Sequence, residues 1–275
     1  MLVRILTSLI LLAVVVFVWM FFLDTLLFNA VIWLLCALAL IEIFKAAGIL
    51  SWRCLTVLAV AQAFVISFMR TQFIGDFALP ALFLIALGYF AALVKNFGSM
   101  KLADCSGAFL FGTLIPLFFS CAIYIRDLHG AQPGGFYLLL ALGAAWLSDT
   151  SAYFVGTFLG KHKLAPKVSP KKTIEGTIGG LVLSTGLLLL LGLLYQNLVG
   201  VSVNFAVLAL ISPVLSMIGM LGDLSASAIK REYGVKDFGN IMPGHGGILD
   251  RFDSVLFTLP AVYVAALHIE LITLL

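Results

Sequence analysis

Hydrophobic residues in this 275-residue chain fall into long continuous runs that are separated by short polar stretches. Each run approaches or exceeds the roughly 20 apolar residues that one α-helix needs to cross the hydrocarbon layer of a membrane. Strands of a membrane barrel would instead show roughly ten-residue stretches of alternating polarity. The pattern therefore predicts an all-α, polytopic integral membrane protein with about nine transmembrane helices. The expected spans are residues 5–23, 26–44, 54–69, 77–94, 105–125, 134–160, 174–194, 205–222 and 248–275.

The composition supports this interpretation. The chain is 63% apolar and only 11% charged, and its mean hydropathy is +1.17, whereas soluble domains have roughly 45–50% apolar and about 25% charged residues. These values exclude a soluble globule and a disordered chain. The net charge of +3 is small, and we expect no nucleic-acid partner.

The distribution of basic residues predicts the orientation in the membrane. With the N-terminus in the cytoplasm and nine spans, 14 of the 16 Lys and Arg residues fall inside and two, Arg70 and Arg126, fall outside. Cytoplasmic connections of membrane proteins carry such an excess of positive charge. We therefore expect a cytoplasmic N-terminus and an outside C-terminus.

The polar residues needed for a reaction concentrate in the second half of the chain. Residues 1–130 contain the first five expected spans, and residues 131–275 contain the last four. Two polar cytoplasmic segments lie in this second region, at residues 161–173 and 223–253. We expect the second region to be catalytic.

The first polar segment is rich in lysine, with five lysines in twelve residues. Such a density attracts anionic lipid headgroups, although ordinary sorting of positive charge to the inside would also produce it. We expect Ser169 and Pro170 to form a turn before the next helix, whose N-terminus favours phosphate. Candidate phosphate-binding residues here are Lys167, Ser169, Lys171, Lys172 and Thr173.

The second polar segment combines acidic, basic and glycine residues. Helical spacing places Asp223, Ser227 and either Lys230 or Arg231 on one face. Further on, Gly246 and Gly247 belong to a glycine-rich loop whose backbone can approach a ligand closely. Asp250 and Asp253 are three residues apart, so on a helix their carboxylates point roughly the same way.

Five acidic residues are expected near the cytoplasmic ends of the last four spans, although an Asp at the centre of a membrane costs roughly 2.5–3.5 kcal/mol. Converging carboxylates require a cation, and a set of oxygen ligands suits Mg²⁺. We expect Asp223 and Asp250 to bind this metal; pairing with Lys230, Arg231 or Arg251 is the alternative, and Asp253 is equally compatible with both. A zinc site is disfavoured because His245 has no second His or Cys nearby. The five residues are Asp149, Glu175, Asp223, Asp250 and Asp253.

Residues 146–253 resemble the phosphatidate cytidylyltransferase family, also called CDP-diacylglycerol synthases. The family signature has the form S-x-apolar-K-R, then K-D, then P-x-H-G-G-apolar-x-D-R-apolar-D. Met242 departs from the usual Leu, Ile or Phe but is also apolar, and the first five spans are generic and add nothing to the resemblance. The matching residues are Ser227, Lys230, Arg231, Lys236, Asp237, Pro243, His245, Gly246, Gly247, Asp250, Arg251 and Asp253.

The resemblance implies that CTP and phosphatidic acid from the bilayer react to give CDP-diacylglycerol and pyrophosphate. It further implies an active site on the cytoplasmic face of a bacterial inner membrane, Asp223 and Asp250 as Mg²⁺ ligands, and a homodimer. The sequence does not decide whether a second, monovalent cation accompanies Mg²⁺. We expect the basic residues of the second segment to neutralise phosphate charge.

Three alternatives remain at this stage. Intramembrane carboxylates also occur in transporters, and a CTP-dependent lipid kinase would also act on lipid and nucleotide. A CDP-alcohol phosphotransferase is matched only in part, by the spacing of Asp250 and Asp253.

Overall fold

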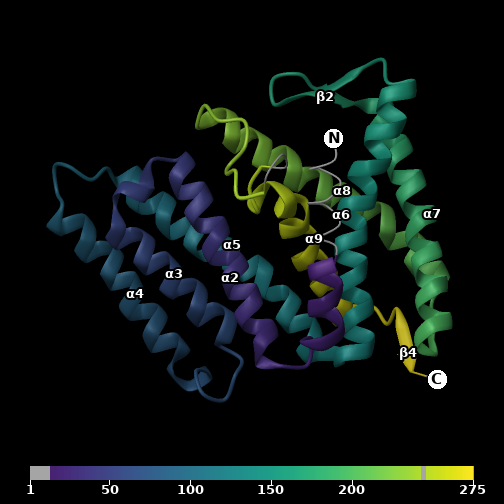
Figure 1. The fold of residues 1–275 in the computed structure, drawn as a ribbon, viewed down its shortest axis with the longest axis horizontal. Coiled ribbons are helices and arrows are strands. Elements are labelled where there is room, and N and C mark those ends of the chain that lie inside the picture. Colours follow the sequence, from purple (N-terminus) through teal and green to yellow (C-terminus); the bar gives the residue numbers. More distant parts are fainter. Residues whose placement is uncertain (1–12, 243–245, 275) are drawn as a thin grey trace. The chain divides into compact units, whose positions relative to one another are not determined.

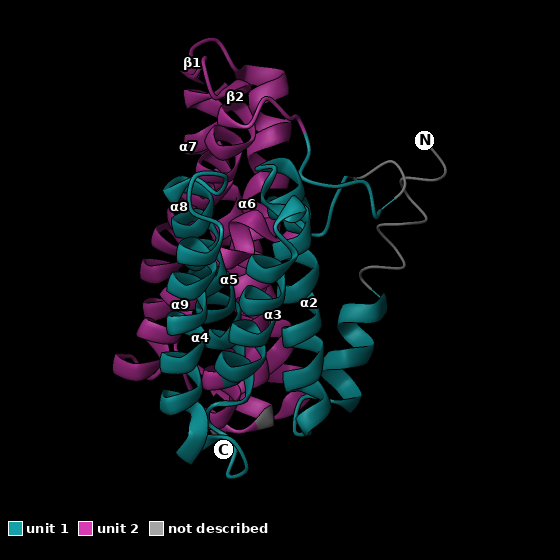
Figure 2. Cartoon of the chain, turned by 90° about the vertical axis from the view of Figure 1, so that its left-hand side faces the viewer, with its two compact units in different colours: residues 1–123, 237–251 teal, residues 124–236, 252–275 magenta. Residues whose placement is uncertain are grey.

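The computed structural model describes residues 13–242 and 246–274. The chain divides into two compact units, which Figure 2 colours separately. Unit 1 consists of Met1–Ile123 and Asp237–Arg251, and unit 2 consists of Tyr124–Lys236 and Phe252–Leu275. The glycine-rich part of the signature thus belongs to the unit of the N-terminal helices.

Unit 1 is built from apolar helices (Figure 1). Residues 13–21 are helical, and helix α2 packs against α3, which packs against α4. Helices satisfy all backbone polar groups internally, as a lipid environment requires. The elements are α2 (Leu26–Ala46), the short 3₁₀ helix η1 (Ile49–Ser51), α3 (Arg53–Phe68), α4 (Gly75–Lys95) and α5 (Leu102–His129), the last of which continues into unit 2.

Unit 2 contains four long helices and two small antiparallel sheets. Helices α6 and α7 pack most extensively. Their backbones are so close at two glycines that a Cβ on Gly176 would lie only 2.8 Å from the Cα of Gly156. Small residues allow this close approach of helix backbones. The elements are α6 (Ala131–Leu159), β1 (Lys163–Ala165), β2 (Ser169–Thr173), α7 (Ile174–Val199), β3 (Val201–Val203), α8 (Phe205–Glu232), α9 (Leu249–His268), which begins in unit 1, and β4 (Ile272–Leu274).

Two local predictions were wrong. The turn of the first polar segment lies at residues 166–168, and Ser169 and Pro170 belong to strand β2, which pairs with β1 and leads directly into α7. The last apolar run is not one helix either, because α9 ends at His268 and β4 pairs with β3. The β-branched residues of these two strands favour extended backbone, and their pairing satisfies the backbone polar groups at this end of the unit.

Six helices in the described part of the chain are long and apolar enough to cross a membrane: α2, α4, α5, α6, α7 and α8. Helix α3 is apolar but has only 16 residues, and α9 is not in this group. The beginning of the first expected span lies outside the described residues. An all-α integral membrane protein is therefore confirmed, whereas nine spans and the orientation of the termini stay predictions.

Candidate active site

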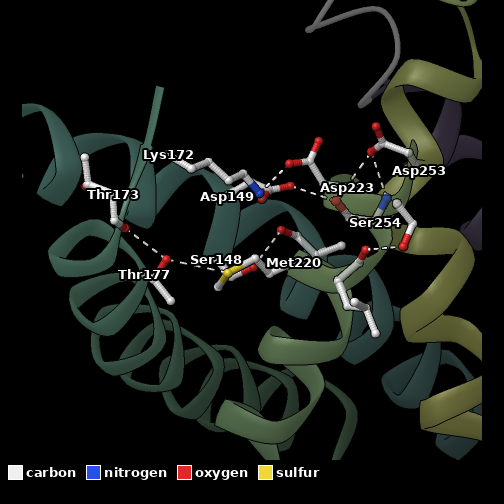
Figure 3. Close-up of polar contacts among 12 residues, drawn as sticks. Ser148, Asp149, Lys172, Thr173, Thr177, Met220, Asp223, Asp253 and Ser254 are labelled. Carbon is white, nitrogen blue, oxygen red and sulfur yellow. Dashed lines mark hydrogen bonds and ion pairs between the residues drawn. The ribbon is translucent and has the colours of Figure 1, made fainter. Parts of the chain in front are cut away.

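A lysine lies between two aspartates in unit 2 (Figure 3). The Nζ atom of Lys172 is 3.7 Å from Oδ1 of Asp149 and forms a shorter ion pair with Oδ2 of Asp223. Neighbouring residues of a strand point to opposite sides, and here Lys171 is exposed whereas Lys172 is half-buried. Strand β2 therefore directs one lysine to the carboxylates of α6 and α8 and leaves its neighbour in the open.

The start of helix α7 holds strand β2 in this place. Oγ1 of Thr173, the N-cap residue, accepts a hydrogen bond of 3.1 Å from the backbone N–H of Gly176. Such a cap satisfies one of the unpaired N–H groups at a helix start. The hydroxyl of Thr177 donates to the carbonyl of Thr173 at 3.0 Å and contacts Sδ of Met220 in α8 at 3.6 Å. These contacts fix Lys172 next to α8.

Helix α9 adds a third carboxylate and a hydroxyl to the cluster. Oγ of Ser254 donates to Oδ2 of Asp149 at 2.9 Å, and the backbone N–H of Ser254 donates to Oδ1 of Asp253 at 2.8 Å. Oδ2 of Asp253 lies 3.8 Å from Nζ of Lys230, and both of these residues are buried. The cluster thus joins residues of α6, β2, α8 and α9.

The donor chemistry of this cluster fits Mg²⁺. Three carboxylates face two ammonium groups, so one negative charge is not balanced within the cluster. Mg²⁺ binds oxygen ligands and commonly takes only one or two carboxylates, with water and substrate phosphates completing its shell. Among the described residues, no group of three or more His, Cys, Asp or Glu side chains is arranged to hold a metal ion. A Mg²⁺ ion bound by one or two of these carboxylates would take its other ligands from water and substrate phosphates.

Asp250 has a different environment in unit 1. Its Oδ2 atom accepts hydrogen bonds from the backbone N–H groups of Phe238 at 2.8 Å and Gly247 at 3.0 Å. Gly246 has a φ of 85°, which favours glycine, and its carbonyl accepts a hydrogen bond from the N–H of Met242. The backbone at Phe238 and at Gly247 therefore holds the carboxylate of Asp250, which is buried.

The structure decides between Lys230 and Arg231 on helix α8. Ser227 and Lys230 are buried, whereas Arg231 is exposed and donates to the carbonyl of Val235 at 3.3 Å. The face of α8 with Asp223 therefore continues through Lys230.

Glu175 has partners outside the aspartate cluster. Its carboxylate accepts hydrogen bonds from the backbone N–H groups of Lys161 at 2.9 Å and His162 at 3.1 Å. It also contacts Nδ1 of His162 at 2.5 Å. Glu175 follows the N-cap of α7 by two residues, so it closes the base of the β1–β2 hairpin.

The remaining predicted residues occupy varied positions. Lys167, Lys236 and Asp237 are exposed, Ser169 and Arg251 are half-buried, and His245 lies outside the described residues. Asp223 belongs to unit 2 and Asp250 to unit 1. Their joint binding of one metal ion stays a prediction.

Two residues of these environments were not singled out from the sequence. Ser254 directly follows the last residue of the signature, but a serine there carries no pattern of its own. Glu42 in α2 accepts hydrogen bonds from the backbone of Ile248 and Leu249. An acidic residue within an apolar run was the signal that could have identified it, because such residues are rare without a partner or a function.

Comparison with known proteins defines the class of this protein. Residues 2–268 match the cytidylyltransferase family. The chain therefore belongs to this family, as the signature predicted.

Individual relatives carry a more specific name. A phosphatidate cytidylyltransferase of Bacillus subtilis (strain 168) is 38% identical over 266 residues, which are 94% of this chain and 95% of the relative. A phosphatidate cytidylyltransferase of Staphylococcus aureus (strain COL) is 42% identical over 187 residues, or 68% of this chain and 67% of the relative. One from Staphylococcus epidermidis is 52% identical over 128 residues, or 46% of this chain and 48% of the relative.

Proposed function

We propose that this protein transfers the cytidylyl group of CTP to phosphatidic acid and produces CDP-diacylglycerol and pyrophosphate for phospholipid biosynthesis. The observation that carries the proposal is the similarity to a phosphatidate cytidylyltransferase over 94% of the chain. The cluster supports the proposal, because Asp223 forms an ion pair with Lys172 and Asp253 forms one with Lys230 within the same unit. Carboxylates and ammonium groups in such an arrangement suit a substrate with several phosphates.

The reaction needs little acid–base chemistry from the protein. An oxygen of the phosphatidate monoester attacks the α-phosphorus of CTP, and the bond from this phosphorus to the bridging oxygen of the β-phosphate breaks. Pyrophosphate leaves with that electron pair. The second pKa of a phosphomonoester is about 6, so the nucleophile is largely ionised at neutral pH. The protein contributes mainly by positioning the two substrates and balancing their charge.

The basic residues divide into two groups in this proposal. Lys172 and Lys230, which contact the aspartates of the cluster, balance the charge of the triphosphate together with Arg231, Lys236 and Arg251. Lys167 and Lys171 are exposed on the hairpin and attract the phosphatidate headgroup and other anionic lipids. Each basic residue near an anionic membrane surface contributes about 1 kcal/mol to such attraction.

Mg²⁺ is part of the proposal, with Asp223 and Asp250 as its ligands. A metal ion held by these residues would neutralise negative charge on the phosphates. We further propose that the site faces the cytoplasm from a bacterial inner membrane. The bias of 14 basic residues to two supports this orientation, and the matched relatives are bacterial.

Labelled CTP tests this function in lipid-reconstituted protein with phosphatidic acid and Mg²⁺, against a blank with EDTA. Label from the α-phosphate that appears in lipid supports cytidylyl transfer. Transfer of the γ-phosphate to lipid would identify a kinase instead. Absence of both labels from lipid, in folded protein, would contradict the proposal and favour a transporter.

A further inference from the structure

Glu42 is a buried acidic residue in the mostly apolar helix α2 of unit 1. Its Oε1 atom accepts a hydrogen bond of 2.9 Å from the backbone N–H of Ile248, and its Oε2 atom accepts one of 2.8 Å from Leu249. Helix α9 begins at Leu249, where N–H groups have no partner within the helix. Both carboxylate oxygens of Glu42 are therefore bonded to the start of α9.

The glycines of the signature segment make room for this carboxylate. A Cβ atom on Gly239 or on Gly247 would overlap the carboxylate of Glu42. The sequence alone associated Gly247 with the approach of a ligand. In the structure, the side chain that Gly247 accommodates is Glu42, so the segment is folded around a residue some 200 positions earlier in the chain.

The same segment also holds Asp250. The backbone N–H of Gly247 donates to Asp250, while the next two N–H groups, those of Ile248 and Leu249, donate to Glu42. Three consecutive N–H groups are thus shared between two carboxylates. A displacement of the Glu42 carboxylate would release two of these groups and move the residue that fixes Asp250.

We propose that Glu42 is a positioning residue that holds the start of α9 so that Asp250 can bind a divalent cation. Glu42 acts through the backbone of residues 247–249. The inference rests on the proposed role of Asp250 as a metal ligand. It extends the site to a helix outside the signature.

The chemistry of the contact requires a carboxylate. Glutamine has the same shape but offers one acceptor oxygen, and its NH₂ group would face a backbone N–H that also donates. Aspartate keeps the charge but is one methylene shorter. Loss of a residue that orients a metal ligand typically weakens metal affinity about 10–100-fold.

The test compares wild-type protein with the Glu42→Gln and Glu42→Asp variants. Mn²⁺ binding followed by electron paramagnetic resonance gives the affinity without turnover, and the Mg²⁺ dependence of product formation gives the half-saturating concentration. We expect Glu42→Gln to raise both the Mn²⁺ Kd and the half-saturating Mg²⁺ concentration at least about tenfold. Glu42→Asp is expected to raise the Mn²⁺ Kd and the half-saturating Mg²⁺ concentration less. This variant also tests the inference if the Glu42→Gln protein does not fold.

Asn29→Leu is the matched control. Asn29 is buried in the same helix and donates to the carbonyl of Ser67 at 2.8 Å, so this variant loses a buried hydrogen bond away from the signature. It should lower the Tm without changing the Mn²⁺ Kd. A Glu42 variant that lowers the Tm but keeps the wild-type Mn²⁺ Kd would show a purely structural role and overturn the inference.

The readouts separate this inference from the proposed function. Asp250→Asn protein with wild-type Mn²⁺ affinity would overturn the inference, because Asp250 would then not bind the metal. If the wild type binds Mn²⁺ through Asp250 and Glu42 but forms no CDP-diacylglycerol, the proposed function fails while the inference stands.

Discussion

Unit 1 and unit 2 hold their acidic residues in different ways. In unit 1, Asp250 and Glu42 each accept hydrogen bonds from two backbone N–H groups. In unit 2, Asp149 and Asp223 contact the side chains of Lys172 and Ser254. Asp253 contacts the side chain of Lys230 and accepts one hydrogen bond from the backbone N–H of Ser254.

The two kinds of hydrogen-bond or ion-pair partner differ in how readily a metal ion or a phosphate can replace them. Backbone donors are fixed by the fold, so the carboxylates of unit 1 keep one position. A lysine ammonium is a compact charge on a flexible four-carbon stem. It can move aside when a metal ion or a phosphate arrives. We infer that the carboxylates of unit 1 are held rigidly and that the charges of the unit 2 cluster are exchangeable.

The largest effect is expected from Asp223→Asn. This change removes one of the proposed metal ligands and the closest ion-pair partner of Lys172. Metal ions contribute several kcal/mol to catalysis, so product formation from CTP should fall about 1,000-fold or more. The turnover rate at saturating Mg²⁺ measures the effect.

Asp127→Asn is the control for this prediction. Asp127 is an exposed carboxylate of the same unit, and it pairs with Arg126 at 2.6 Å. Neither Asp127 nor Arg126 belongs to the aspartate cluster, so turnover should stay near that of wild type. Full activity of folded Asp223→Asn protein would contradict the assignment of Asp223.

Lys172→Met should separate catalysis from metal affinity. Removal of the ammonium leaves the Asp149 and Asp223 carboxylates without their shared partner, so Mn²⁺ should bind more tightly. The kcat/KM for CTP should nevertheless fall about 100-fold, because a charge that stabilises the developing negative charge is lost. Titration with Mn²⁺ and steady-state kinetics measure the two changes.

Lys171→Met provides the comparison, because the neighbouring lysine is exposed. We expect it to leave the Mn²⁺ affinity unchanged. If Lys172→Met also left the Mn²⁺ affinity unchanged, unit 2 would not contain the exchangeable cation that the comparison of the two units infers.

Gly247→Ala should destabilise unit 1 without altering any charge. The new methyl group would overlap the carboxylate of Glu42, and overpacking of this kind costs about 1–3 kcal/mol. The free energy of unfolding, or the Tm in detergent, measures the loss. Combination with Glu42→Ala should cost less than the sum of the single changes, because the overlapping atoms are gone.

Gly186→Ala is the matched control for the added methyl group. A Cβ at Gly186 in helix α7 would meet no atom within 4 Å, and alanine favours helix by about 1 kcal/mol over glycine. The Tm should therefore stay the same or rise. Equal Tm values for wild-type and Gly247→Ala protein would contradict the tight packing around Glu42.

The smallest effect is expected from Ser254→Ala. The change removes one hydroxyl donor to Asp149, but Lys172 still contacts this carboxylate. A hydrogen bond to a charged group contributes about 1.5–3 kcal/mol, and the remaining partner should limit the loss in kcat to about tenfold. Ser212→Ala removes a buried hydroxyl that donates to the carbonyl of Leu208 in α8, and its kcat should match that of wild type. A kcat for Ser254→Ala equal to that of Ser212→Ala would exclude a role of the hydroxyl in the cluster.

The helices were largely predictable, and the short strands were not. Apolar runs predicted α2, α4 and α7 closely because lipid requires continuous helices of limited length. The segment from Lys163 to Thr173 is polar and has no clear period, so its hairpin was not recognised. The strand at Ile272–Leu274 is as apolar as the helix before it, and hydropathy does not separate the two.

The site was predictable in composition but not in its pairings. The signature contains Lys230, Asp250 and Asp253, and the polar segment before it pointed to Asp223. Asp223 was expected to pair, if at all, with the basic residues of its own segment. Its partner is Lys172, from the other polar segment. The first five spans were considered generic, although α2 supplies Glu42 to the signature segment.

By itself, the sequence determined the membrane class, the family and the residue types of the site, because hydropathy and motif spacing are local properties of the chain. Only the tertiary structure decided which charges meet. It placed Lys172 between Asp149 and Asp223, and it bonded Glu42 to the start of α9. Ion pairs and hydrogen bonds act over a few ångströms, and only the folded arrangement of helices and hairpin brings such distant parts of the chain that close.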